Sequence, residues 1–311
     1  MKSASSTTLT KPPPETGPGS SLQQGKWNRF LEEHAMHVLL GMSALYIWLF
    51  INDTAGTRHL GRLAVLGALL FPVMLHSGRY WLAVSGVLIA GLLPALHKID
   101  NHIFLAAYWT FAVAASLFAS APQIALRTNA RLLLGLCFLF ATLWKLISLE
   151  FMRGAFFQMT FLVDARFADF AMYVAGVSGE ALATNMERYS GLRDPTSSLM
   201  QISLQSAPRV AVLALATAYW TVWIEAVIAV AFLWRGDRGP ARIRNPALLV
   251  FMVSAYGVAP VPGFAALLAI LGFANCRREE TRARWLYLLA FLLVPYSDVP
   301  LRLFLQLGWL G

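Results

Sequence analysis

The chain has 311 residues, of which 58% are apolar and only 13% are charged, and its mean hydropathy is +0.58. Soluble domains carry about 25% charged residues, so this chain has too little polar surface to cover a globule of its size in water. The net charge is +9, but the basic residues cluster in short gaps between apolar runs, as they do in membrane proteins. Composition therefore predicts an integral membrane protein surrounded by lipid and argues against nucleic acid as a partner.

The N-terminal residues predict a disordered tail. The stretch Met1–Lys26 is rich in Ser, Thr, Pro and Gly and buries too little apolar area to offset the entropy lost on ordering. It lacks the basic start, apolar stretch and small-residue cleavage site of a signal peptide. We therefore expect a disordered cytoplasmic tail at 1–27 and one transmembrane domain at 28–311, with the first apolar run retained as a helix.

Apolar runs predict an all-α fold, a polytopic integral membrane bundle of about eight or nine spans, since each span needs about 20 mostly apolar residues. The stretch at 150–209 is too long for an ordinary connection, and we expect it to form a long outer loop. Two apolar pieces within it, Phe156–Val163 and Phe167–Val177, are too short to span and are expected to lie in the interface or to cap the bundle. The runs of spanning length are 35–52, 60–76, 80–97, 103–120, 132–149, 210–234, 246–275 and 285–310.

The basic residues give this bundle an orientation. Arginines concentrate in alternate gaps, at 77–79, 121–131 and 235–245, and the positive-inside rule places these gaps and the tail in the cytoplasm of a multi-pass cell-membrane protein. The run 246–275 has Arg-rich segments on both sides, so it is expected to go out and return as a short hairpin, turning at the break Gly257–Gly263. A single kinked helix is the alternative, and it would violate the charge rule.

Ionisable residues at membrane depth are costly and mark candidate sites. Asn101 and His102 belong to the connection before the fourth run, and Lys145 lies near the outer end of the fifth, followed by Glu150. The charge pattern places both groups on the outer face. A desolvated Lys can act as a base near neutral pH, and a His can donate a hydrogen bond. Alternatively, Lys145 snorkels to the lipid headgroups.

Three further polar positions have two interpretations each. Glu225 lies in the middle of the sixth run with no polar neighbour in sequence, so it is either a functional carboxylate or a neutral one hydrogen-bonded to another helix. Cys137 and Cys276 stand alone, which favours packing over a disulfide or redox role. No metal site is predicted from these residues.

Two of these segments resemble a known family. The segment Lys98–Leu105 (KIDNHIFL) is similar to the Asn-His connection of the vitamin K-dependent gamma-carboxylases and of their bacterial relatives, the horizontally transferred transmembrane (HTTM) family. The segment Trp144–Gly154 (WKLISLEFMRG) resembles their segment with a Lys-Leu pair, an acidic-aromatic pair and a Gly. The residues Phe156–Phe167 also resemble bacterial members, and Glu225 more weakly resembles a Glu in a later span. The resemblance covers roughly 28–310.

The resemblance implies quinone chemistry on the outer face. Lys145 would be the base that deprotonates a reduced quinone similar to vitamin K hydroquinone, and His102 would assist it. Asn101, Glu150 and Glu225 are then expected to orient groups or bind substrate, in an oxygenation that forms an epoxide. The large lumenal domain of the carboxylases is not present up to Gly311, so propeptide-directed peptide carboxylation is not expected.

Two classes of function follow from these patterns. The first is a carboxylase-like enzyme whose partners are membrane lipid and either a quinone or a small peptide substrate. The second is a non-enzymatic membrane protein that acts in transport, in peptide maturation or immunity, or as a structural partner. A cavity shared by Lys145 and His102 would favour the first, and a water-lined path near Glu225 would favour transport.

Overall fold

The computed structural model of the chain describes residues 18–51, 55–93, 101–193 and 201–296. These residues form α-helices joined by short 3-10 turns and contain no β-strand, which confirms the all-α class. The α-helices are α1 (Pro18–Phe50), α2 (Ala55–Leu70), α3 (Gly78–Leu92), α4 (Asn101–Leu117), α5 (Pro122–Ile147), α6 (Leu149–Met152), α7 (Ala155–Val163), α8 (Ala168–Tyr173), α9 (Gly179–Arg193), α10 (Pro208–Leu233), α11 (Arg244–Val258), α12 (Pro262–Asn275) and α13 (Thr281–Leu293). The 3-10 turns are η1 (Pro72–His76), η3 (Ala165–Phe167), η4 (Gly239–Ile243) and η5 (Val294–Tyr296).

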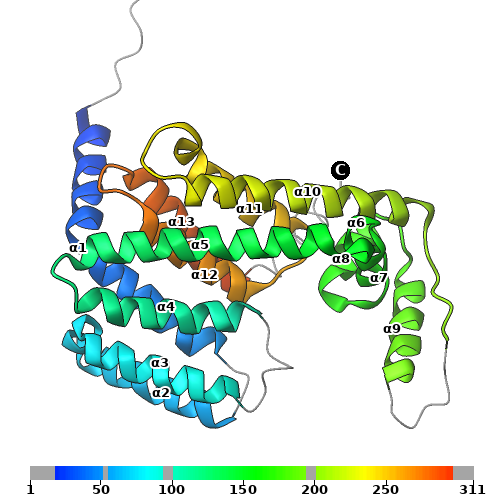
Figure 1. Cartoon of the computed structure of the whole chain (residues 1–311), viewed down its shortest axis with the longest axis horizontal. Coiled ribbons are helices and arrows are strands. Elements are labelled where there is room, and N and C mark those ends of the chain that lie inside the picture. Colours follow the sequence, from blue (N-terminus) through cyan, green and yellow to red (C-terminus); the bar gives the residue numbers. More distant parts are fainter. Residues whose placement is uncertain (1–17, 52–54, 94–100, 194–200, 297–311) are drawn as a thin grey trace, which may run out of the picture.

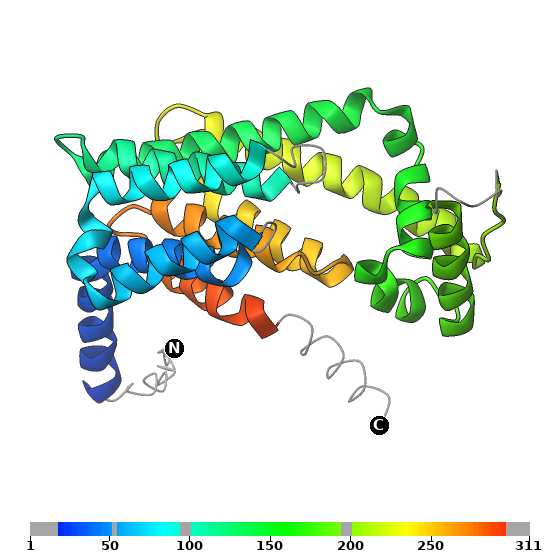
Figure 2. The same cartoon turned by 90° about the horizontal axis from the view of Figure 1, so that it is seen from below.

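The two longest apolar helices, α5 and α10, pack side by side along the length of the molecule (Figures 1 and 2). Each has 26 residues, which at 1.5 Å per residue is about 39 Å. Among the described residues these two helices are long and apolar enough to cross a membrane. Helices α3, α4 and α12 are apolar but shorter, so the larger number of spans expected from the sequence stays a prediction.

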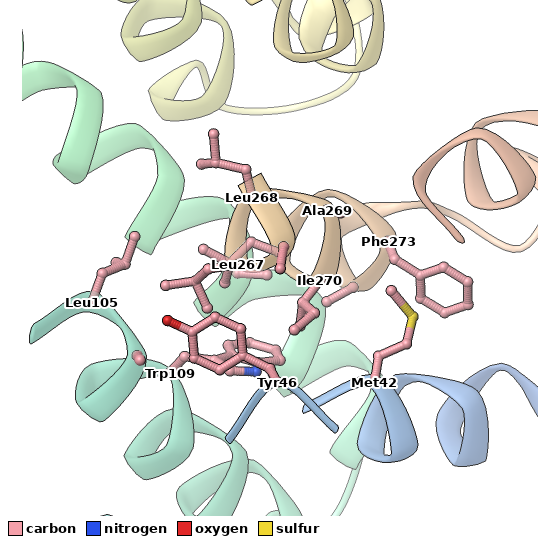
Figure 3. Packing of buried hydrophobic residues seen from close by; sticks show 14 of the residues in the cluster. Met42, Tyr46, Leu105, Trp109, Leu267, Leu268, Ala269, Ile270 and Phe273 are labelled. Carbon is pink, nitrogen blue, oxygen red and sulfur yellow. The ribbon is translucent and has the colours of Figure 1, made fainter. Parts of the chain in front are cut away.

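Helix α12 is the centre of the bundle. Its residues from Ala265 to Asn275 are all buried, and it packs against α1, α4, α5, α11 and α13. A helix that is apolar on every side belongs in such an interior position. Around it Leu267 and Ile270 meet aromatic side chains from α1 and α4 (Figure 3), where Trp109 Nε1 donates a hydrogen bond to Ser43 Oγ over 3.0 Å.

The run 246–275 is a helical hairpin, as expected. Helices α11 and α12 are separated at 259–261, where Pro260 and Pro262 interrupt the backbone hydrogen bonding of a continuous helix. The start of α11 lies beside the segment that follows α12, since Asn245 Nδ2 donates to Glu280 Oε1 over 3.1 Å. The chain therefore goes out and returns to the same end of the bundle, and the kinked single helix is wrong.

Helices α6 to α9 gather at one end of the molecule and cover the N-terminal half of α10 (Figures 1 and 2). They share a second apolar core with α10, separate from the main core, which includes Phe157, Phe161, Ala171 and Ala214. The short apolar pieces of 150–209 thus cap the bundle, which was one of the two predicted arrangements.

Two helix starts differ from the sequence-based expectation. Helix α1 begins at Pro18, so residues 18–27 of the expected tail are helical, because Leu22–Lys26 includes good helix formers continuous with the apolar run. Helix α5 begins at Pro122, so the expected loop at 121–131 is helical, with Pro at the first helical position. Residues 1–17 lie outside the described residues, as do Lys98 and Asp100.

Candidate functional site

Lys145 and Glu225 form an ion pair between α5 and α10. Lys145 Nζ donates to both carboxylate oxygens of Glu225, at 2.6 Å from each. The Lys145 side chain is 19% exposed and the Glu225 side chain 6%. Glu225 lies well inside α10, and Lys145 lies in the last turn of α5. The pair is therefore nearly enclosed by two helices that are otherwise apolar over most of their length.

Close backbone packing brings these two helices together. On α5, a Cβ added at Gly135 would lie 2.7 Å from Leu233 Cδ2, so only Gly allows this approach. After α5, Ser148 Oγ accepts a hydrogen bond from the backbone N–H of Phe151 and starts α6. Gly154, with φ of 75°, then lies against the backbone of Leu215. The chain is thus folded back onto α10 directly after Lys145, and this fixes the end of α5.

The Lys145 ammonium turns away from its sequence neighbours. Trp144 and Ile147 point outward, at 72% and 73% exposure, whereas Lys145 Nζ turns to Glu225 and lies 5.5 Å from the centre of the Phe151 ring. A cation over an aromatic face is stabilised by the ring quadrupole. The structure therefore does not show the snorkelling arrangement of Lys145, because its charge is held inside the α5/α10 contact.

An aromatic path connects this pair to an open groove. The Phe151 ring stacks on Phe156, with centroids 5.6 Å apart, and Phe156 lines a groove of about 1040 Å³. The groove is lined mainly by α7, η3 and α9, with apolar walls from Met159, Val163 and Phe167. Its volume is at the upper end of the roughly 300–1,000 Å³ typical of small-molecule sites. The groove therefore has room for an apolar ligand, and the rings of Phe156 and Phe151 lie between it and the Lys145 pair.

Charged groups occupy part of the groove rim. Glu150 is exposed there, and Asp164 binds Arg166 through both carboxylate oxygens, with the shortest contact at 2.6 Å. Burial alone would raise the pKa of Asp164, but the hydrogen bonds and charge of Arg166 outweigh it, so that the pKa lies below its ordinary value of 3.8. The rim thus presents a fixed carboxylate–guanidinium pair beside an apolar wall.

The other predicted site residues have different neighbours. His102 lies against the first turn of α12, where a Cβ added at Gly263 would be 2.8 Å from His102 Nε2. Within the described part of the chain, Lys145 forms no hydrogen bond or ion pair with His102 or with Glu150. Asn101 begins α4, and its side chain lies outside the described residues. The structure thus brings together Lys145 and Glu225 from the predicted set.

The sequence carries a signal for the pairing of Lys145 with Glu225. Glu225 is the one acidic residue in α10, and Lys145 is the one charged residue in the C-terminal half of α5. Two opposite charges at membrane depth are expected to find each other, because each is costly alone. The sequence does not show which helices are neighbours, so the shared outer face and the family resemblance instead predict His102 as the partner of Lys145.

Comparison with known proteins places this chain in no family. No protein-family model matches it, no curated protein sequence is significantly similar to it, and no solved structure matches its fold. Among the described residues there is no group of three or more His, Cys, Asp or Glu side chains arranged to hold a metal ion. The groups that the site offers for chemistry are the Lys145 amine and the Glu225 carboxylate, with the groove beyond Phe151 and Phe156.

Proposed function

We propose that the chain is a carboxylase-like integral membrane protein of the HTTM type, in which Lys145 is the base that deprotonates a reduced quinone. The observation that carries the proposal is the position of Lys145 Nζ, 2.6 Å from both oxygens of Glu225 and largely removed from water. General bases are held in this way, in a fixed orientation and with a neighbouring group that controls the proton.

Glu225 is proposed to set the protonation state of the amine. In apolar surroundings a proton shared by the pair can reside on nitrogen, which gives two charges, or on oxygen, which gives an uncharged amine and an uncharged acid. The second arrangement supplies the neutral amine that a base requires. When Lys145 then takes the proton of a quinol hydroxyl, Glu225 can release its own proton to water and so offset the new positive charge on the ammonium.

The groove beside Phe156 is proposed to hold the substrate. Its walls are aromatic and aliphatic, which suits a fused aromatic ring with an apolar tail. The Phe156 and Phe151 rings lie between this groove and the Lys145 ammonium, so the proposal requires the quinol to pass these rings before its hydroxyl comes within hydrogen-bond reach of Lys145 Nζ. In the overall reaction, the quinol and O2 would give the quinone epoxide and one water. His102 lies against the start of α12 and, within the described residues, forms no hydrogen bond with Lys145, so proton transfer is proposed for Lys145 and Glu225 alone.

The membrane arrangement is part of this proposal. The shorter helices also carry large apolar side chains that are exposed, such as Leu63 and Leu70 on α2 and Leu289 on α13. Contiguous exposed apolar faces of this kind are typical of contact with lipid. They support the proposal that eight or nine segments, including the α11/α12 hairpin, cross or enter a cell membrane. The cytoplasmic N-terminus in this proposal rests on the Arg-rich gaps of the sequence.

Single cysteines test this orientation. In a variant without Cys137 and Cys276, Arg238→Cys and Glu150→Cys place thiols at exposed positions near opposite ends of the bundle. In intact cells, a membrane-impermeant maleimide should label the Glu150 position, while the Arg238 position should need permeabilised membranes. Equal labelling of both positions in intact cells would contradict the proposed arrangement.

The enzymatic proposal is tested with purified protein in lipid nanodiscs. Wild-type protein, a chemically reduced naphthoquinone and O2 should give epoxide, measured by chromatography, and Lys145→Ala should give none above the background reaction. Because the single variant leaves Glu225 buried and unpaired, the double variant Lys145→Met/Glu225→Gln is the second test, since it keeps the shape and removes both charges. Wild-type epoxide formation no faster than that of the folded double variant would contradict a base role.

A structural role for the pair is the alternative, and one observation favours it. Both carboxylate oxygens of Glu225 are already engaged by Lys145, so the pair would also serve as a clamp between α5 and α10 in a non-enzymatic membrane protein. On this alternative, loss of the pair would lower stability while the wild-type protein forms no epoxide.

A further inference from the structure

A second site lies at the opposite end of α5, where arginines converge on a small cavity. The cavity has a volume of about 170 Å³. Arg127 and Arg131 reach it from the first turns of α5, Arg244 from the start of α11, and Arg277 from the segment after α12. Four guanidinium groups from three parts of the sequence thus meet in one place that the proposed quinone chemistry does not use.

Arg244 is the buried member of this group. It is 8% exposed, and its Nε donates to Ala231 O over 2.8 Å. Its Nη2 donates to Trp234 O and Gly236 O over 2.6 Å and 3.1 Å. Within the described part of the chain, Arg244 Nη1 has no hydrogen bond, and no carboxylate pairs with this guanidinium. The end of α10 therefore fixes the side chain through backbone carbonyls and leaves its positive charge unbalanced.

The two carboxylates beside the cavity are occupied by other groups. Asp237 forms an ion pair with Arg277. Glu280 accepts hydrogen bonds from the backbone N–H of Arg277, over 2.7 Å, and from Asn245 Nδ2, over 3.1 Å. Four arginines and two carboxylates line the cavity, and Glu279 lies outside it, 4.0 Å from Arg277, so the cluster keeps an excess of positive charge that is centred on Arg127, Arg131 and Arg244. Burial lowers the pKa of the Arg244 guanidinium, and the positive charges of Arg131 and Arg127 lower it further, while Glu280 opposes them.

Such an arrangement is costly unless an anion completes it. Like charges held together in a partly buried cavity repel one another, and a bound anion offsets this electrostatic repulsion. Guanidinium groups present planar pairs of N–H donors that match the oxygens of a phosphate. The cavity is smaller than the roughly 300–1,000 Å³ of sites for drug-sized ligands, so it suits a single phosphate group better than a nucleotide.

We infer that Arg127, Arg131 and Arg244 form a binding site for one phosphate group. Two sources share this chemistry, namely the headgroup of an anionic phospholipid and free inorganic phosphate. The lipid source rests on the proposed membrane arrangement, because the site lies level with the end of α10, where exposed Trp234 is typical of an interfacial residue. Basic pockets between helices at the membrane surface bind anionic headgroups. The inorganic source does not depend on the membrane proposal.

The experiment compares wild-type protein with Arg127→Gln/Arg131→Gln. These substitutions leave Arg244 and its carbonyl contacts in place. Arg209→Gln is the matched control, because Arg209 is exposed at the opposite end of α10. One arm measures binding of radiolabelled inorganic phosphate to detergent-purified, delipidated protein. The other arm measures the shift in Tm between nanodiscs of phosphatidylcholine alone and nanodiscs containing phosphatidylglycerol.

We expect wild-type and Arg209→Gln proteins to give equal phosphate affinity and an equal Tm shift. We expect the double variant to bind phosphate about tenfold more weakly or worse, or to lose most of the Tm shift. Binding in the first arm identifies inorganic phosphate, whereas an effect in the second arm alone identifies the lipid headgroup. No binding in either arm would overturn the inference, as would an equal loss in the Arg209 control, which would show general surface electrostatics. If the double variant does not fold, Arg127→Gln alone, at an exposed position, makes the same comparison.

Discussion

Lys145 Nζ and the two carboxylate oxygens of Glu225 meet at 2.6 Å although the residues are 80 positions apart in sequence. Each group comes from the face of its helix that turns to the other helix, while Trp144 and Trp223 beside them turn outward. A charge in an apolar interface has to be paired or neutralised, so packing of α5 against α10 that separates the two side chains is disfavoured. The same ion pair thus joins α5 to α10 and contains the amine that is proposed to act as the base.

The first prediction is that loss of one partner of this pair destabilises the protein more than replacement of both side chains by uncharged ones. Glu225→Ala leaves the Lys145 charge without its partner and should cost about 3–5 kcal/mol of unfolding free energy. Lys145→Met/Glu225→Gln should cost less, because neither side chain is then charged. Unfolding in nanodiscs, followed by tryptophan fluorescence, gives the ranking. Glu150→Gln, at an exposed position, is the control and should change stability by less than about 0.5 kcal/mol. A double variant less stable than Glu225→Ala would contradict the argument.

The second prediction concerns the contact between His102 and Gly263. An added Cβ at Gly263 would lie 2.8 Å from Nε2 and 3.1 Å from Cδ2 of the imidazole, so Gly263→Ala forces the ring or α12 to move. Overpacking of this kind costs about 1–3 kcal/mol. Gly257→Ala is the matched control within the same hairpin, since nothing lies within 4 Å of its added Cβ. A drop in Tm for Gly263→Ala alone is the expected result. Equal Tm values for the two variants would show that the imidazole does not pack there.

The sequence predicts those parts of the fold that depend on local patterns, and it does not predict those that depend on contacts between distant residues. The hairpin was predictable because Pro260 and Pro262 interrupt an apolar run between two Arg-rich segments. The start of α5 was not, because Arg127 and Arg131 resemble a polar loop until their common cavity is known. Arg127 and Arg131 share that cavity with Arg244, and the sequence does not show that these residues lie close together.

The candidate site was predictable only in part. Apolar context singled out Lys145 and Glu225 as unusual residues, since a charged residue in a spanning helix is costly. Their pairing depends on which faces of α5 and α10 meet, and close approaches such as Gly135 against Leu233 decide this in three dimensions. The charge pattern and the family resemblance instead predict His102 as the partner of Lys145, and the structure places that ring against Gly263.

The third prediction is a pH dependence at the groove rim. The pKa of Asp164 is held below its ordinary value of 3.8 because the Arg166 contacts outweigh burial. A lowered carboxyl pKa in the folded state adds stability that is complete above the ordinary pKa and is lost as the pH falls through the lowered pKa. The Tm of wild-type protein should therefore exceed that of Asp164→Asn at about pH 6, and the difference should shrink below about pH 4. Glu187→Gln, on the exposed face of α9, is the control for removal of a surface carboxylate. A difference that grows on acidification would reverse the sign and refute the assignment.

The fourth prediction separates binding in the groove from chemistry at the amine. Phe156 lines the groove and stacks on Phe151, so Phe156→Ala removes an aromatic contact worth about 0.5–1.5 kcal/mol beyond buried area. If the groove holds a quinol, the variant should bind a naphthoquinone about tenfold more weakly, measured by quenching of tryptophan fluorescence, and should raise KM with little change in kcat. Lys145→Met/Glu225→Gln should do the reverse, lowering kcat while the quinone still binds. Phe140→Ala, an outward-facing position on α5, controls for loss of a lipid-facing aromatic ring. Unchanged quinone binding in Phe156→Ala would place the substrate elsewhere, and the Lys145 amine would then need another route of access.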